Sequence, residues 1–305
     1  SDVYKRQVEG QRVPLDIWGA ILATLGSTAL VLGLTSAGKG ASNPVFIVAM
    51  LVGIASLGAF FITQKHTENG VLPLSLFTRR DRVFTFIAIF LLGAIMTTVA
   101  VFVALYVQTI LKYTTLRAGL AFIPFAFALA LGAATASKIS MKWAPRWIIL
   151  AGCIFMVIGF GWGTAISEES TFWADIFPPT LIIGYGVGLV SIALTLSAVA
   201  GVKPIDVGPL TAISLVAQTL GGPIGLAFAG ALAQSYTRHH GGADIPVTEM
   251  NSVQLHALGE GYLLTLFVCL GLAVVMGILS ALFIRFTVPD VVEGQKANEA
   301  ANDLP

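Results

Sequence analysis

Stretches of about 20 uncharged, mostly apolar residues recur along the whole sequence of 305 residues. A helix rises 1.5 Å per residue, so about 20 apolar residues cross the hydrocarbon core of a bilayer. Only 11% of the residues are charged, against about 25% in soluble domains, and 56% are hydrophobic. The sequence therefore predicts an all-α polytopic membrane protein.

Eight apolar segments are predicted to be transmembrane helices. They lie at 15–36, 44–64, 83–111, 118–137, 147–166, 177–200, 208–234 and 261–286. A linker at 65–82 combines leucines with arginines, which suits a short amphipathic segment on the cytoplasmic membrane surface. The tail at 287–305 is polar and acidic, so we expect it to be cytoplasmic and disordered.

The first residues, 1–7, have neither an apolar run nor a cleavage site, and so they do not resemble a signal peptide. They resemble instead the translated end of a sequencing adapter. We therefore expect these residues to be an artefact, and the natural sequence to begin near Val8, with a part of the protein missing upstream.

Loop charges predict the orientation. With the N-terminus placed in the cytoplasm, and with Lys5 and Arg6 of the expected artefact left out, eleven Lys and Arg fall on the cytoplasmic side and four fall outside. The eleven are Arg12, Lys65, Arg79, Arg80, Arg82, Lys138, Lys142, Arg146, Lys203, Arg285 and Lys296, and the four are Lys39, Lys112, Arg117 and Arg238. The positive-inside rule then predicts a multi-pass protein of the cell inner (cytoplasmic) membrane, with both termini of this segment in the cytoplasm.

Several classes of function are not expected. A net charge of +1 gives no sign of a nucleic-acid partner. Cys153 and Cys269 lie in apolar segments and are expected to be small buried hydrophobes. Adjacent histidines in a glycine-rich loop, His239 and His240, are more often solvated than bound to metal, and His256 lies in the same loop. Because acids, His and Cys do not cluster at membrane depth, we expect no enzyme, no metal and no cofactor.

The segment 208–234 carries no charge, but it has Gln218 near its middle, followed by a run of glycines and a proline. That run consists of Gly221, Gly222, Pro223 and Gly225. A membrane helix tolerates proline where a neighbour satisfies the freed carbonyl, and glycines let that neighbour come close. We therefore expect a kinked, tightly packed helix. The sequence leaves open whether its polar face lines a substrate path or only packs.

Other polar or aromatic side chains within the segments are candidates for a substrate path. With Gln218, the set is Thr98, Tyr106, Gln108, Tyr185, Ser191, Ser214 and Gln218. For each of them a simple helix–helix contact is the alternative. Asp and Glu are absent from the seven segments between 44 and 286, although a proton-coupled carrier needs a titratable group in its path.

An ordered set of short motifs resembles one family. The motifs are Leu72-Pro73-Leu74-Ser75-Leu76-Phe77, Tyr106-Val107-Gln108, Arg117-Ala118-Gly119 with Pro124, Pro178-Pro179, Val207-Gly208 and Gly221-Gly222-Pro223-Ile224-Gly225. Together they resemble the fourteen-helix drug:proton antiporter branch of the major facilitator superfamily. The resemblance implies that 8–64 is the central pair of linker helices, that 83–286 is the C-terminal six-helix bundle, and that the N-terminal six-helix bundle is missing.

The family also repeats a cytoplasmic motif, G-x-x-x-D-R-x-G-R, whose acid and base form a latch at the cytoplasmic gate. The equivalent run here is 137–146. Lys142 keeps the first base, Arg146 supplies a second one place late, Lys138 adds another, and Met141 stands where the acid would be. A role as topology signals alone is the alternative for these bases.

The resemblance implies the C-terminal half of a proton-coupled secondary exporter of the multidrug-efflux type. Such a protein moves small lipophilic molecules by alternating access. Its partners would be a small-molecule substrate, protons, the lipid bilayer and the missing bundle. The alternatives are an exporter of one metabolite or siderophore, and a membrane scaffold that transports nothing.

Overall fold

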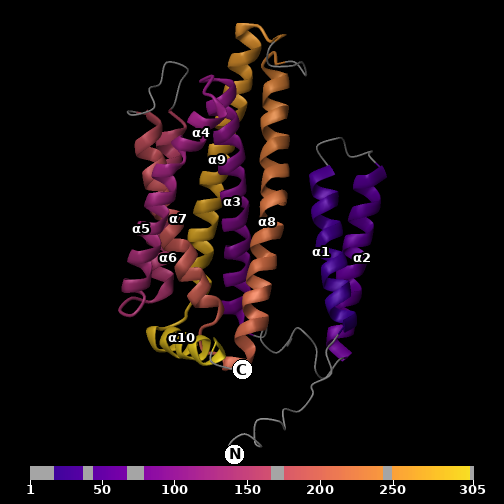
Figure 1. Ribbon diagram of the computed structural model, residues 1–305, viewed down its shortest axis with the longest axis vertical. Coiled ribbons are helices and arrows are strands. Elements are labelled where there is room, and N and C mark those ends of the chain that lie inside the picture. The colour runs from indigo at the N-terminus through magenta and orange to yellow at the C-terminus, as the bar shows by residue number, and fades with distance from the viewer. Residues whose placement is uncertain (1–16, 37–43, 67–78, 166–174, 243–248, 303–305) are drawn as a thin grey trace, which may run out of the picture.

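The structure is a computed structural model that describes residues 17–36, 44–66, 79–165, 175–242 and 249–302 (Figure 1). All regular elements in these ranges are helices. They are α1 (Ile17–Ser36), α2 (Pro44–His66), α3 (Arg80–Thr109), α4 (Thr115–Ala121), α5 (Ile123–Ile139), α6 (Pro145–Gly163), α7 (Phe177–Ala198), α8 (Pro204–His239), α9 (Ser252–Phe283) and α10 (Val288–Asn302). The predicted artefact at 1–7 and most of the predicted surface linker lie outside the described residues.

The all-α architecture is confirmed, and six stretches of the described chain are long and apolar enough to cross a membrane. These stretches are α3, α4 with α5, α6, α7, α8 and α9. The apolar parts of α1 and α2 are shorter, at Trp18–Gly33 and Pro44–Phe60. Two of the eight predicted crossings therefore stay predictions.

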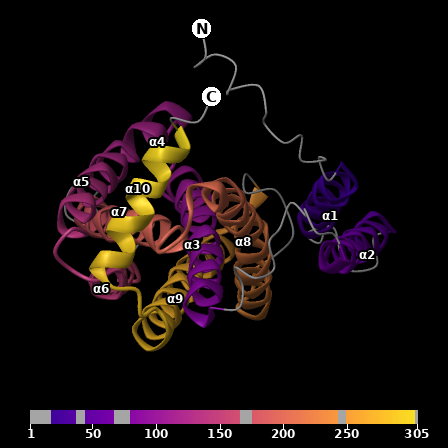
Figure 2. The ribbon, with the colours of Figure 1, turned by 90° about the horizontal axis from the view of Figure 1, so that it is seen from below.

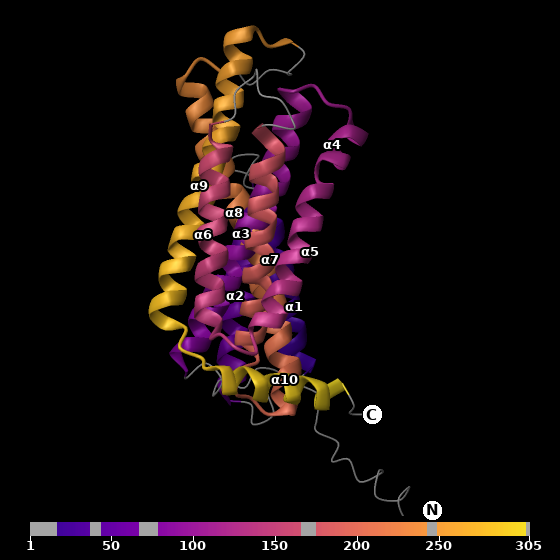
Figure 3. The same cartoon turned by 90° about the vertical axis from the view of Figure 1, so that its left-hand side faces the viewer.

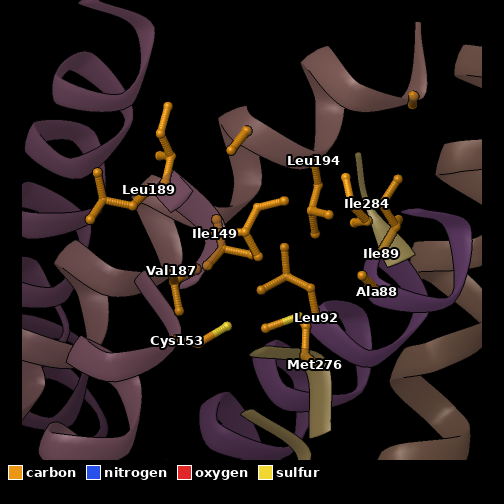
Figure 4. Close-up of a cluster of buried hydrophobic side chains, with 14 of the residues drawn as sticks. Ala88, Ile89, Leu92, Ile149, Cys153, Val187, Leu189, Leu194, Met276 and Ile284 are labelled. Carbon is orange, nitrogen blue, oxygen red and sulfur yellow. The ribbon is translucent and has the colours of Figure 1, made fainter. Parts of the chain in front are cut away.

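The six long stretches form one bundle around a shared apolar core. α7 packs against α5 and α6, α3 packs against α8 and α9, and α6 also packs against α9. Figure 4 shows side chains from α3, α6, α7 and α9 converging in this core, among them Leu92, Ile149, Leu194 and Met276. The apolar windows of α3 and α7 are 56% and 61% buried, against 17% for α4 with α5 and 22% for α8. The bundle therefore leaves α5 and α8 largely uncovered.

α1 and α2 form a separate hairpin beside α8 (Figures 1 and 2). Three glycines lie where the two helices come closest: Gly26 meets Leu57, Gly33 meets Met50, and Gly53 meets Leu30. A side chain at any of these glycines would overlap its partner. Close approach of the helices is therefore what holds this hairpin together.

The expected disorder of the tail is wrong, because most of the tail forms α10, which lies across one end of the bundle (Figures 2 and 3). Val291, Gly294 and Ala297 are spaced by three residues, so they share one face of the helix, and all three are buried. Charged residues lie on the outer face and make the segment polar overall, so its composition does not indicate the short apolar face. We call this end of the bundle the α10 end, and the opposite end, where α4 lies, the α4 end.

Two predicted boundaries also differ. α9 begins at Ser252 rather than near 261, because the Asn251 side chain accepts from the Gln254 N–H while the Gln254 side chain accepts from the Asn251 N–H. The helix predicted at 118–137 is interrupted between α4 and α5. Pro124 lies in the first turn of α5 and has no N–H to continue the ladder from α4.

Candidate functional site

α3 and α8 touch through their backbones near the middle of the bundle. Gly93 on α3 faces the backbone carbonyl of Gln218, and Gly221 on α8 faces that of Phe90. Gly225 packs one turn further along α8, also against α3. A side chain at any of the three glycines would overlap the facing helix. The glycines therefore set the distance between the two helices.

The neighbouring Gly222 faces a side chain instead of a backbone. A Cβ placed there would lie 2.5 Å from Thr97 Oγ1 of α3. α8 continues as one helix through Pro209 and Pro223, although each proline removes a backbone hydrogen bond. The predicted kink at Pro223 stays a prediction.

The seven predicted path residues are spread over three helices. Thr98, Tyr106 and Gln108 lie on α3, Tyr185 and Ser191 on α7, and Ser214 and Gln218 on α8. Thr98 and Tyr106 are buried, Gln108 is exposed, and the other four are half-buried. The structure thus does not gather them into one closed site within this bundle.

Several of these side chains have partners that suit a packing role. Ser214 Oγ donates to the Leu210 carbonyl at 2.8 Å, and Tyr185 meets Phe155 edge-on at 5.2 Å between ring centroids. Thr98 differs, because its hydroxyl is buried and has no hydrogen-bond partner within the described part of the chain. An unsatisfied buried polar group costs about 1–3 kcal/mol, so Thr98 is the path candidate with the least structural explanation.

A small cavity of about 30 Å³ lies between α3, α9 and the start of α7. Tyr106 is the one predicted path residue that lines it, and Tyr262 and Thr265 of α9 are polar lining residues that the sequence analysis did not single out. Drug-sized ligands occupy pockets of about 300–1,000 Å³. This cavity has room for about one water and not for such a ligand.

The predicted gate loop joins α5 to α6 at the α10 end (Figure 3). Lys138 and Lys142 are exposed, and Arg146 is half-buried in the first turn of α6. The Arg146 guanidinium lies 5.1 Å from the centroid of the Trp147 ring. Among the described residues, none of the three bases forms an ion pair with a carboxylate. The exposed Met141 side chain occupies the position of the family's acid.

A residue that the sequence analysis counted only as a topology signal, Arg82, proves to be buried. It is 2% exposed, and its Nη2 donates to the Ala200 carbonyl at 3.0 Å, in the turn between α7 and α8. The next residue, Gly201, has a φ of +62°, which glycine adopts without strain. The Gly201 N–H donates to the Asp290 carbonyl of α10 at 2.9 Å. No local pattern identifies Arg82, since 118 residues separate it from Ala200.

Asp290 fixes the start of α10 on this turn. One carboxylate oxygen accepts from the Thr287 N–H at 2.8 Å and from the Thr287 hydroxyl at 2.7 Å. The Thr287 N–H, the Thr287 hydroxyl and the nearby Arg79 hold the pKa of Asp290 below its ordinary value, although partial burial opposes them. Arg79 also lies over the Phe286 ring, at 5.0 Å from its centroid. The start of α3, the α7–α8 turn and the start of α10 are thus joined at the α10 end.

A second polar cluster joins α8 and α9 at the α4 end. The Tyr236 hydroxyl donates to Glu260 Oε2 at 2.9 Å, and His256 Nε2 lies 3.3 Å from Glu260 Oε1. Tyr236 also stacks on His240, with 3.9 Å between ring centroids. Glu260 lies just before the helix predicted at 261–286, outside the predicted segments. The capping pattern Asn251-Ser252-Val253-Gln254 was the signal that could have placed it in α9.

Comparison with known proteins relates this geometry to a family, although no family model matches the chain. The chain is 38% identical over 297 residues to an uncharacterized MFS-type transporter, EfpA, of Mycobacterium tuberculosis, covering 97% of this chain and 56% of the relative. It is 31% identical over 219 residues to the cephamycin export protein CmcT of Amycolatopsis lactamdurans, covering 71% of this chain and 45% of the relative. The chain belongs to the major facilitator superfamily (MFS).

Other comparisons agree with this assignment. The puromycin resistance protein pur8 of Streptomyces alboniger is 25% identical over 231 residues, covering 75% of this chain and 46% of the relative. Relatives named for antibiotic export and resistance support a place in the drug-efflux branch of the MFS. A bacterial homolog of the human lysosomal transporter Spinster, in an inward-facing and occupied conformation, has the same fold. It matches with a TM-score of 0.57 and 16% identity, covering 90% of this chain and 67% of that structure.

The MFS assignment makes the chain a multi-pass membrane protein, and its relatives are transporters rather than enzymes. The chain spans about half the length of the curated relatives it matches.

Proposed function

We propose that this chain is the C-terminal half of a proton-coupled secondary exporter of the multidrug-efflux type, which moves small lipophilic molecules by alternating access. The observation that carries the proposal is 38% identity over 297 residues to an MFS-type transporter of which the chain covers only 56%. The uncovered α5 and α8 add support, because a second six-helix bundle would pack on them. The substrate path would then run between the two bundles.

The α3–α8 contact suits a bundle that moves as a rigid body. Gly93 and Gly221 bring the two backbones together, so α8 cannot slide on α3 without breaking close contacts. The half-buried Ser214 and Gln218 lie one turn apart on α8, and we propose that they line the path. The coupling proton would bind elsewhere, because acids in the described membrane-spanning stretches lie only near helix ends, at Asp81, Asp206 and Glu260. We place the proton-binding acid in the N-terminal half.

An efflux assay tests the proposal. Full-length protein, produced in bacteria that lack their own exporters, should lower the accumulation of lipophilic dyes and antibiotics, and a protonophore should abolish the effect. Residues 8–305 alone should insert without efflux, because one bundle has no partner surface for an alternating path. Export restricted to one metabolite or siderophore would favour a dedicated exporter, and no export of any tested compound would favour a scaffold.

Two variants of α8 separate packing from transport in the full-length protein. Gly222→Leu places a bulky side chain against Thr97, and overpacking of this kind costs about 1–3 kcal/mol. It should lower both expression and transport. Gln218→Ala removes a half-buried polar side chain that can bond across helices, and such a bond is worth roughly 0.6 kcal/mol in membranes. The change should therefore leave expression unchanged and alter substrate preference. Wild-type transport of a whole substrate panel by Gln218→Ala would remove Gln218 from the path.

We also propose that the α10 end is cytoplasmic, because the sequence assigns eleven of the fifteen basic residues counted above to the cytoplasmic loops, and described members of that set such as Arg82, Lys142 and Lys203 lie at the α10 end. Cysteine labelling tests this orientation at two exposed positions. Leu116→Cys, at the α4 end, should react with an impermeant thiol reagent in intact cells, and Met141→Cys, at the α10 end, should not. The reverse pattern would invert the topology.

A further inference from the structure

Three basic residues lie at the α5–α6 loop, and within the described part of the chain none of them forms an ion pair with an acid. Lys138 and Lys142 are exposed, and Arg146 follows at the start of α6. Arg146 Nε is shielded from solvent and has no hydrogen-bond partner in the described part of the chain. The run 137–147 contains no Asp or Glu. Three neighbouring positive charges without a counter-charge repel one another, so an external anion is favoured among them.

Large apolar side chains surround these charges. Met141, Trp143 and Trp147 are 62%, 59% and 50% exposed. Trp at the ends of membrane helices lies at the level of the lipid headgroups. Trp143 lies in the loop and Trp147 in the first turn of α6, so the two tryptophans flank Pro145. A small anion in water would gain nothing from these rings, whereas a lipid offers its phosphate to the bases and its glycerol and acyl region to the rings.

The start of α6 adds a third feature that suits an anion. Ala144, which precedes the helix, provides no side-chain cap for the first-turn N–H groups, and Pro145 follows it. A helix N-terminus carries a partial positive charge, which adds to that of Arg146. The stacking of Arg146 on Trp147 holds the guanidinium beside this helix start.

We propose that Lys138, Lys142, Arg146, Trp143 and Trp147 form a binding site for the phosphate of an anionic phospholipid, in the leaflet at the α10 end. The bases hold the phosphate, and the two indoles anchor the loop at headgroup depth. This site requires membrane insertion and not transport, so its failure would leave the proposed function untouched. It gives the bases of this loop a role other than gating or topology.

Tryptophan fluorescence in vesicles tests the site on the complete chain. Of the five tryptophans, Trp18, Trp162 and Trp173 are changed to Phe, which leaves the two in the loop as reporters. The protein is reconstituted in phosphatidylcholine vesicles that contain brominated phosphatidylglycerol, or the same fraction of brominated phosphatidylcholine. Brominated phosphatidylglycerol should quench the two reporter tryptophans at a much lower mole fraction than brominated phosphatidylcholine does, because the anionic lipid accumulates at the loop.

Charge variants decide whether the bases cause this preference. The double variant Lys142→Gln with Arg146→Gln should shift the quenching midpoint for phosphatidylglycerol about thirtyfold, since each base near an anionic surface contributes about 1 kcal/mol. The double variant Lys142→Arg with Arg146→Lys keeps both charges, so its quenching midpoint for phosphatidylglycerol should be nearly that of the unchanged protein. The matched control removes Lys112 and Arg117 at the α4 end, where Arg117 lies 3.9 Å from the centroid of the Tyr113 ring. It should leave the midpoint unchanged.

Three results would overturn the proposal. The first is equal quenching by the two brominated lipids, and the second is an equal shift in the control variant. The third is displacement by millimolar inorganic phosphate in the vesicle buffer, which would indicate a site for a soluble anion instead. Circular dichroism of every variant should show unchanged helix content. If the Gln pair does not fold, the single variants Lys142→Gln and Arg146→Gln replace it, and each should shift the midpoint about fivefold.

Discussion

The two ends of the six-helix bundle join their helices by different means. At the α10 end, Arg82 is 2% exposed and bonds to a backbone carbonyl, and Gly294 packs directly against the Val199 carbonyl. At the α4 end, the charged side chains beside the α8–α9 contact remain accessible to solvent: Glu260, which accepts from Tyr236 of α8, is 41% exposed, and its α9 neighbour His256 is 63% exposed. Both ends also carry exposed charge, but of these charged side chains only Arg82, at the α10 end, is buried.

The difference shows that charge contributes to stability according to its burial. An exposed ion pair is worth about 0–1 kcal/mol, because water and salt screen it. A buried hydrogen bond from a charged group is worth about 1.5–3 kcal/mol, and its loss leaves the partner unsatisfied. We therefore expect the α10 end to hold α3, α8 and α10 together firmly, and the tips of α8 and α9 to separate more easily.

The largest effect is expected at Arg82. Arg82→Ala leaves the buried Ala200 carbonyl without its donor and opens a space beneath the α7–α8 turn, so it should lower the free energy of unfolding by about 1.5–3 kcal/mol. Thermal unfolding of the purified protein in detergent measures this. Arg80→Ala, the exposed arginine beside it, is the control and should change little. Equal stability of the two variants would remove the distinction between the ends.

A smaller effect is expected at Gly294. Gly294→Leu would overlap the Val199 carbonyl and so push α10 away from the bundle. We expect this to weaken the docking of α10 by about 1–3 kcal/mol and to leave the six-helix bundle unaffected. Limited proteolysis should then cut within α10 while the six-helix bundle stays intact. Glu293→Leu alters the exposed neighbouring position and should not increase cleavage. Full resistance of Gly294→Leu would show that α10 does not depend on this contact.

Acid should weaken the same contact. The pKa of Asp290 is held below its ordinary value, so the ionised carboxylate stabilises the docked α10. This stabilisation is complete above the unfolded pKa of about 3.9 and is lost as the pH falls through the folded pKa. A nitroxide label on Glu299→Cys, on the exposed face of α10, should therefore become more mobile below about pH 4. Adding Asp290→Asn should remove most of this pH response. An unchanged response would assign it to another group.

The smallest effect is expected at the α4 end. Glu260→Gln removes the charge that faces His256 but can still accept from Tyr236, so stability should fall by less than about 1 kcal/mol. The change should shrink further at high salt, since the pair is exposed. Thermal unfolding at low and high salt measures both effects. A loss as large as that of Arg82→Ala would mean that this end is also a firm joint.

Most helix positions could be predicted from the sequence, because each long helix is an uncharged apolar run bounded by polar residues. The failures occurred where a short-range signal was weak or was overlooked. The apolar stripe of α10, Val291, Gly294 and Ala297, is hidden among charged residues, and the capping box at Asn251 was not used to extend α9. Arg82 could not be identified in this way, since its partner lies 118 residues away.

The sequence by itself determined that this chain crosses a membrane as helices. In a bilayer each backbone group must be satisfied locally, so apolar length alone is enough to predict a helix. Only the tertiary structure decided which side of each helix is buried, because segments such as α8 carry almost no periodic pattern of apolar residues. The contact of Gly221 with α3 and the burial of Arg82 follow from packing between distant segments.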